Sequence, residues 1–140
     1  MKEIKKSLKT VKLQDLKLYK DNPRHNTRSA LMVAKSIEKF GYIVPIVCNK
    51  DLVILAGNTR YKALKHLNIE EIDVIVIEGL TPEEEREFVI ADNRIGEYST
   101  WNASAISRLT SNEDSEFLES IGMKSHKQME KALEDLINGK

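Results

Sequence analysis

One junction in the chain, the stretch "LAGNTRYKALKHL" at residues 55–67, constrains the fold more than any other stretch. A short apolar run at residues 52–56 stops at Gly57, and a helical pattern begins at about Thr59. Glycine tolerates a positive φ and close approach of other backbone, and Asn58 or Thr59 is suited to cap a helix. The junction therefore predicts a strand that turns sharply into a helix.

Apolar patterns on both sides of this junction predict further strands and helices. Alternation over residues 11–19 indicates an early strand with a bend at residues 14–15, and helical spacing over residues 29–41 indicates a helix. The runs "YIVPIVCN", "LVIL" and "EIDVIVIE" read as short strands. We therefore expect an α+β fold, with a small mixed sheet of about four strands and packed helices.

The last strand is followed by a strong helix start and then by a polar, helical tail. Thr81 is placed as the N-cap, Pro82 suits the first helical position, and Glu84 completes a capping box. After Trp101 we expect helices at residues 103–109, 115–121 and 125–137. The resulting division is a basic arm at 1–10, a domain at 11–102 and a helical extension at 103–140.

The charge is balanced overall but uneven along the chain. The formal net charge is zero, so no overall field draws the protein to nucleic acid or membrane. The start is nevertheless basic, and its lysines are either a solvated terminus or an arm that touches DNA phosphates. The candidate DNA contacts are Lys2, Lys5, Lys6 and Lys9.

The cysteine and histidine content excludes several classes of site. Cys48 is the single cysteine and lies in an apolar run, which is typical of a buried thiol and rules out an internal disulfide. His25, His66 and His126 are too scattered for a histidine metal cluster. No apolar stretch approaches the roughly 18 residues of a membrane span, and no signal peptide is evident, so we expect a cytoplasmic protein without membrane contact.

The junction could also cradle an anion. The free N–H groups of a helix's first turn point at one spot, where the helix dipole is positive. Arg60 lies in that turn and offers a planar, bidentate donor set to the same spot. Strand, glycine, cap and helix also occur together in ordinary turns, so spacing leaves both interpretations open.

Two other segments carry polar residues at predicted element ends. "DNPR" offers Arg24, and "ADNRIGEY" offers Asp92, Asn93 and Arg94. A carboxylate beside an amide can hold Mg²⁺ through oxygen atoms, and an arginine can neutralise phosphate charge. The alternative is a polar helix end, with Asn93 in a left-handed conformation and Arg94 favourably placed near the helix C-terminus.

Taken together, these segments resemble the ParB N-terminal domain, which has the ParB/sulfiredoxin fold. The resemblance spans residues 11–102 and rests on "DNPR", "GYIVPIVC", "AGNTRYKAL" and "ADNRIGEYSTWN". Stand-alone chains of similar sequence often occur in phage and mobile-element genomes, near DNA methyltransferases. Partition members of the family bind CTP with Mg²⁺ and use it to clamp DNA.

The resemblance implies roles for individual residues. Gly57, Arg60 and Ala63 match the family's phosphate motif, from which Asn58, Thr59 and Lys62 depart. Gly41 and Pro45 resemble the segment near the base, whereas Asp92 and Asn93 correspond to a glutamate–asparagine pair. The implied ligands of the pocket are Mg²⁺ and a nucleoside triphosphate, CTP or ATP, with Gly57, Asn58, Thr59, Arg60, Asn93, Arg94 and Arg24 around the phosphates.

Three functions stay open at this stage. The leading hypothesis is a nucleotide-binding module in the DNA transactions of a phage or mobile element. This hypothesis leaves open whether the nucleotide is hydrolysed, and it is compatible with a homodimer. The others are a DNA-binding or nuclease-like protein and a non-catalytic interaction module for a DNA methyltransferase or other phage protein. Sulfiredoxin chemistry is disfavoured, because the catalytic cysteine position is Asn58 here.

Overall fold

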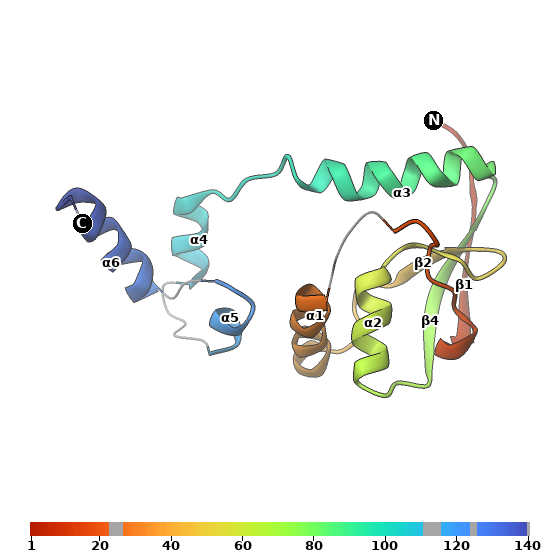
Figure 1. The fold of residues 1–140 in the computed structure, drawn as a ribbon, viewed down its shortest axis with the longest axis horizontal. Helices are drawn as coiled ribbons and strands as arrows, with labels where there is room; N and C mark the ends of the chain where they lie inside the picture. The colour runs from red at the N-terminus through yellow and green to blue at the C-terminus, as the bar shows by residue number, and fades with distance from the viewer. Residues whose placement is uncertain (23–26, 111–115, 124–125, 140) are drawn as a thin grey trace. The chain divides into compact units, whose positions relative to one another are not determined.

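The computed structural model describes residues 1–22, 27–110, 116–123 and 126–139. The chain divides into two compact units, Met1–Tyr98 and Ser99–Lys140. The first unit holds the sheet and three α-helices (Figure 1). The second holds α4 (Ala103–Thr110), α5 (Glu116–Ser120) and α6 (His126–Ile137), which confirms the expected helical tail in the residues described.

The first unit is built on a four-stranded mixed sheet with the order β1-β4-β2-β3. Its strands are β1 (Lys5–Lys12), β2 (Ile46–Asn49), β3 (Ile54–Ala56) and β4 (Glu71–Glu78). β4 pairs antiparallel with β1 and parallel with β2, and β3 pairs antiparallel with β2. The α+β fold class and the mixed sheet predicted from the sequence are therefore confirmed.

The first strand lies elsewhere than expected. It begins at Lys5 and ends at Lys12, so the predicted strand over residues 11–19 was wrong in its bounds. The predicted bend is a short 3-10 helix, η1 (Leu13–Asp15), after which Lys17 forms an isolated bridge with Val53. Seven of the eight β1 side chains are exposed, and such an edge strand lacks the buried apolar alternation that reveals a strand in sequence.

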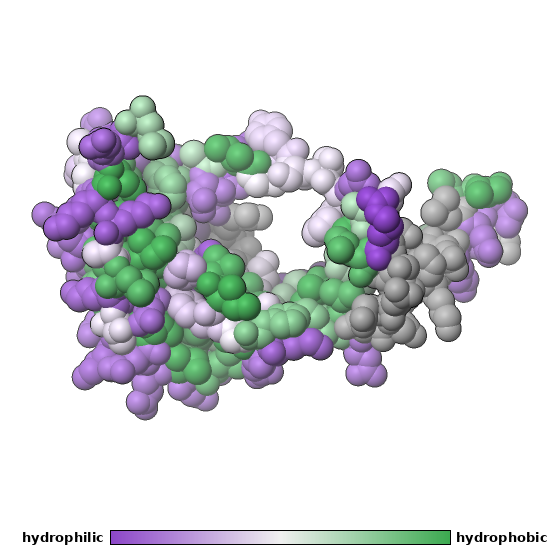
Figure 2. Space-filling model, turned by 180° about the vertical axis from the view of Figure 1, so that it is seen from behind, coloured by the Kyte–Doolittle hydropathy of each residue, from purple (hydrophilic) through white to green (hydrophobic). Residues whose placement is uncertain are grey.

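Helices cover both faces of the sheet. α1 (Thr27–Phe40) and α2 (Asn58–His66) lie side by side, and Leu64 of α2 joins the larger core cluster on one face. α3 (Pro82–Gly96) contributes Val89 to a second cluster with Leu55 and Ile77 on the other face. The space-filling view shows hydrophilic and hydrophobic side chains next to each other on the surface (Figure 2).

A buried asparagine fixes the turn between β2 and β3. The Asn49 side-chain oxygen accepts hydrogen bonds from the backbone N–H groups of Asp51 and Val53, both at 3.0 Å. Its amide nitrogen donates to the two carboxylate oxygens of Glu85 at 3.3 and 3.2 Å. Asn49 thus shapes the tight connection that the sequence predicts and also ties α3 to the sheet.

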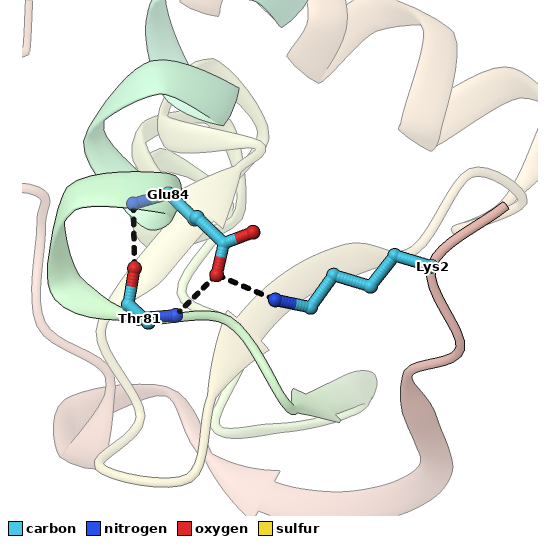
Figure 3. A network of polar contacts seen from close by, with 3 residues as sticks. All are labelled: Lys2, Thr81 and Glu84. Atoms are coloured by element: carbon cyan, nitrogen blue, oxygen red, sulfur yellow. Dashed lines mark hydrogen bonds and ion pairs between the residues drawn. The ribbon is translucent and has the colours of Figure 1, made fainter.

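The start of α3 carries the predicted capping box (Figure 3). The Thr81 hydroxyl accepts from the Glu84 N–H at 3.1 Å, and the Glu84 carboxylate accepts from the Thr81 N–H at 3.0 Å. The Lys2 ammonium donates to the same carboxylate oxygen at 2.5 Å. The chain's first residues are therefore attached to the N-terminus of α3.

Within residues 1–22, 27–110, 116–123 and 126–139, no helix is long and apolar enough to cross a membrane.

Candidate phosphate site at the start of α2

A cavity of about 620 Å³ opens at the N-terminus of α2 in the first unit. It is surrounded by α1 along most of its length, the loop that follows α1, the end of β3, the first turn of α2 and one stretch of α3. Its lining includes seven residues that the sequence analysis singled out: Gly41, Gly57, Asn58, Thr59, Arg60, Asp92 and Asn93. Tyr42, which follows Gly41 directly, lines it as well.

Gly57 makes the turn from strand to helix and is itself the N-cap of α2. Its φ is +113°, in the left-handed region that side chains rarely adopt. A Cβ at this position would lie 2.9 Å from Cγ1 of Ile46 and 3.0 Å from Nη1 of Arg60. The position therefore requires glycine, both for its backbone angle and for the space around it.

The predicted side-chain cap was wrong. α2 begins at Asn58, one residue earlier than expected, so Asn58 and Thr59 lie inside the first turn, and the N-cap residue Gly57 supplies no side-chain cap. The Asn58 side chain is buried, and its oxygen faces the backbone N–H of Tyr19 at 3.4 Å. The positive end of the helix dipole is thus open toward the cavity without an acidic or hydroxyl cap.

Arg60 brings a positive charge to the cavity without a close carboxylate. Burial lowers the pKa of Arg60, and the nearby Tyr42 and Asp92 oppose that shift. Among the described residues, no carboxylate lies within 4.0 Å of its guanidinium. A partly buried cation without a close counter-charge carries a desolvation cost in free energy, which a bound anion offsets. The electrostatics of the site therefore favour a bound anion.

Tyr42 is a site residue that the sequence analysis missed. Its hydroxyl oxygen accepts a hydrogen bond from the Ile46 N–H at 2.7 Å, and burial raises the pKa of the phenol. The phenol therefore stays neutral and keeps a proton that it can donate into the cavity. The signal was available, since Tyr42 lies between Gly41 and Pro45, the two residues that were singled out in that loop.

The loop after α1 contains Gly41 and Pro45, the two residues that the resemblance assigns to the side of the base. Gly41 has a φ of +89° and its N–H bonds the Ile37 carbonyl, which ends α1. Gly41 lines the cavity, and the exposed apolar residues Ile43 and Val44 follow it there. Pro45 does not line the cavity. The wall on this side is apolar enough to cover the flat face of a ring.

α3 brings one carboxylate and one amide to the cavity. Asp92 and Asn93 both line it, and the Asn93 amide nitrogen donates to the Val89 carbonyl at 2.7 Å. The alternative of a left-handed helix end at Asn93 was wrong, because α3 continues to Gly96. With the nitrogen engaged, the amide oxygen is the end that a cation would meet.

These two residues suit Mg²⁺ only in company with phosphates. Among the described residues, no three histidine, cysteine or acidic side chains form a metal-binding group. Mg²⁺ in proteins often uses one or two carboxylates and completes its shell with substrate phosphates and water. Asp92 and Asn93 meet that pattern, whereas they could not form a site for the ion alone.

Several candidates lie away from the cavity. Arg94 is exposed, forms an ion pair with Glu97, and donates to the Tyr98 hydroxyl at 3.0 Å. Lys2 is bonded to Glu84, and Lys5 lies 3.7 Å from Glu78. Lys6 and Lys9 lie on β1, and Arg24 falls outside the described residues.

The Cys48 thiol has no part in this site. It is fully buried in the core, and burial raises its pKa. A protonated, inaccessible thiol is a poor nucleophile.

The comparisons with known proteins agree with this fold. The family model of the ParB N-terminal domain matches residues 1–94. YnaK of Escherichia coli K12, a ParB-like nuclease domain-containing protein, is 35% identical over 75 residues, covering 53% of this chain and 86% of YnaK. The chain therefore belongs to the ParB N-terminal domain family.

Two solved structures show the same fold at low sequence identity. The C-terminally truncated ParB of Caulobacter crescentus, complexed with CTP-γ-S, aligns with a TM-score of 0.63 at 19% identity, over 84% of this chain and 72% of that chain. A Pnob8-like ParB N-domain aligns with a TM-score of 0.55, also at 19% identity. That match covers 81% of this chain, which spans half of the Pnob8-like chain.

Proposed function

We infer that the chain is a ParB-like module that binds a nucleoside triphosphate, CTP or ATP, together with Mg²⁺. The observation that carries this inference is Arg60, a partly buried cation beside an uncapped helix start, with no carboxylate within 4.0 Å among the described residues. Phosphate supplies both the acceptor atoms for the helix start and the counter-charge for the guanidinium.

The cavity offers suitable residues for each part of the ligand: the phosphates, the Mg²⁺ ion and the base. The backbone of Gly57, Asn58 and Thr59 and the Arg60 side chain would hold the phosphates. Asp92 and Asn93 would hold Mg²⁺ against them, and the loop after Gly41 would cover the base. A nucleotide analogue bound to the Caulobacter relative supports this assignment.

We place this module in DNA transactions of a phage or mobile element, in the cytoplasm, with a DNA methyltransferase as a protein partner and a homodimer as the working assembly. These assignments rest on the sequence motifs and the family resemblance. Arg24 and Arg94 stay candidates for further phosphate charge, and the division of the chain at residues 10 and 102 stays our proposed domain plan.

A nuclease is the second candidate, favoured by the name of the YnaK relative. Hydrolysis with two metal ions needs a set of metal-binding carboxylates, and the described residues contain no such group. A nuclease assay on supercoiled DNA with Mg²⁺ and Mn²⁺ separates the two functions. Cleavage that Arg60→Ala leaves intact would favour the nuclease.

The nucleotide proposal is tested by calorimetry with CTP, ATP and GTP in the presence of Mg²⁺. We expect binding of at least one nucleotide, and we expect Arg60→Ala to weaken it by about 10- to 100-fold, the value of one charge-assisted hydrogen-bonded contact. Arg86→Ala is the matched control, since Arg86 is an exposed arginine on α3 outside the cavity. Failure of all three nucleotides to bind at millimolar concentration would refute the proposal.

A further inference from the structure

β1 is an edge strand with an outer side that pairs with no strand of the described chain. It lies at the end of the sheet order, and its eight residues pair with β4 alone. An exposed strand edge presents a row of N–H and C=O groups to any chain that can lie beside it. The length of β1 is therefore enough for a further strand to dock.

The hydrogen-bond register identifies the residues whose backbone faces outward. The Leu13 N–H donates to the Glu70 carbonyl at 2.8 Å, so this pair is a hydrogen-bonded pair. Hydrogen-bonded and non-hydrogen-bonded pairs alternate in an antiparallel ladder, and the β1–β4 register runs without a shift. The backbone N–H and C=O groups of the odd-numbered β1 residues therefore point toward β4. Those of Lys6, Leu8 and Thr10 point away from β4, toward the outer edge.

The side chains of β1 define what could lie along this edge. Lysines are spread along the whole strand, at positions 5, 6, 9 and 12, and Leu8 is 71% exposed. β4, the strand that β1 already pairs with, places Glu78 opposite Lys5 and Glu71 opposite Lys12. It also places Asp73 opposite Thr10, which donates to that carboxylate, and Ile75 opposite Leu8. A strand that complements β1 is thus acidic with aliphatic residues between its carboxylates.

We propose that the outer edge of β1 is a docking site for an extended acidic peptide of a partner protein, which adds a fifth strand to the sheet. The backbone of Lys6, Leu8 and Thr10 supplies the ladder bonds, and the lysines on both faces select carboxylates. Leu8 receives an aliphatic side chain beside Ile75.

Charge complementarity separates this partner from two other occupants. A second copy of the chain would bring the lysines of one β1 against those of the other, and like charges on paired strands are destabilising. Duplex DNA would meet lysines divided between two faces of the sheet, because Lys5 and Lys9 share one face and Lys6 the other.

The test uses a ten-residue peptide in which glutamate alternates with valine or threonine, labelled for fluorescence anisotropy and added to the full chain. We expect binding that weakens with salt and that fails when alternate backbone nitrogens of the peptide are methylated. Methylation removes ladder donors but leaves the charge unchanged. Equal binding of the methylated peptide, or no binding at millimolar peptide, would overturn the proposal.

Amide hydrogen exchange locates the contact. In the free chain the amides of Lys6, Leu8 and Thr10 should exchange fast, and the peptide should slow all three. Concentration-dependent protection of these amides without peptide would assign the edge to a second copy and overturn the proposal. Duplex DNA that displaces the peptide without protecting these amides would overturn it in favour of a DNA surface.

Charge reversal supplies the final arm. Lys6→Glu with Lys9→Glu should weaken the peptide about tenfold at low salt. Lys20→Glu with Lys35→Glu makes the same change in net charge at exposed positions away from β1. Equal losses in the two double variants would overturn the proposal, because they would show that net charge alone drives binding.

Discussion

At the scale of the residue, the site depends most on the glycine at the start of α2. Replacement of Gly57 by alanine places a Cβ against Ile46 in a backbone region that alanine avoids. We expect Gly57→Ala to lower the free energy of unfolding by about 1–3 kcal/mol and to weaken the nucleotide. Urea unfolding measures the first effect and calorimetry the second.

Gly96→Ala is the matched control for this substitution. No heavy atom of the described residues lies within 4 Å of a Cβ there, and no positive φ opposes it. Its stability should stay within about 0.5 kcal/mol of the parent chain. Equal losses for the two variants would contradict the special requirement for glycine at position 57.

Asp92 should control how strongly the affinity for the nucleotide depends on Mg²⁺. Its carboxylate lines the cavity and interacts with Arg60, so it repels phosphate when no cation lies between them. Asp92→Asn should therefore tighten the nucleotide in EDTA and reduce the gain that Mg²⁺ gives. Nucleotide titrations with and without Mg²⁺ measure this, and an unchanged Mg²⁺ gain would exclude Asp92 as a ligand of the ion.

The residues of the site differ in how far the sequence reveals them. Gly57 and Arg60 could be predicted, because their roles depend only on neighbouring residues. Gly57 makes the strand–helix turn, and Arg60 lies in the first turn of the helix that follows. Tyr42 was missed although it lies between Gly41 and Pro45, because its hydrogen bond with the Ile46 N–H is evident only in the structure. Arg94 could not be placed, since the sequence does not show that its guanidinium pairs with Glu97 and Tyr98 rather than lining the cavity.

At the scale of the element, the start of α3 should be sensitive to acid. The hydrogen bond from Lys2, and next the backbone N–H of Thr81, lower the pKa of Glu84 below its ordinary value of 4.5. The carboxylate therefore stabilises the fold fully above its unfolded pKa, and this stabilisation is lost as pH falls through the lower folded pKa.

Lys2→Met tests that relation. It removes the largest cause of the shift, so the variant should be less stable than the parent at pH 7 and nearly equal to it at pH 2, as urea unfolding at the two pH values would show. Lys20→Met serves as the control. A stability difference that persists unchanged at pH 2 would mean that Lys2 acts through something other than the Glu84 charge.

Elements differ as well in how well sequence predicts them. The start of α3 could be predicted from Thr81, Pro82 and Glu84, because these residues interact within one helical turn. β1 was misplaced because pairing with β4, rather than its own pattern, makes it a strand. A helix cap can be predicted because its interacting residues are adjacent in sequence. An exposed edge strand cannot, because it depends on pairing with a strand far along the chain.

At the scale of the whole molecule, the buried apolar side chains that the structure describes all lie in Met1–Tyr98. A fragment ending at Tyr98 should therefore unfold in one cooperative transition, with a urea midpoint close to that of the sheet-containing unit in the full chain. Circular dichroism with urea measures this. A fragment without a cooperative transition would show that the sheet-containing unit needs residues 99–140 to fold.

The pairing of β1 with β4 also has a consequence for synthesis. Thr10 and Asp73, which bond across the two strands, are 63 positions apart, so the ribosome makes one about 3 to 13 s before the other at about 5–20 residues per second. During that interval the nascent β1 has no partner strand from its own chain. Its closely spaced lysines would keep the emerging segment from pairing with neighbouring nascent chains until β4 leaves the exit tunnel.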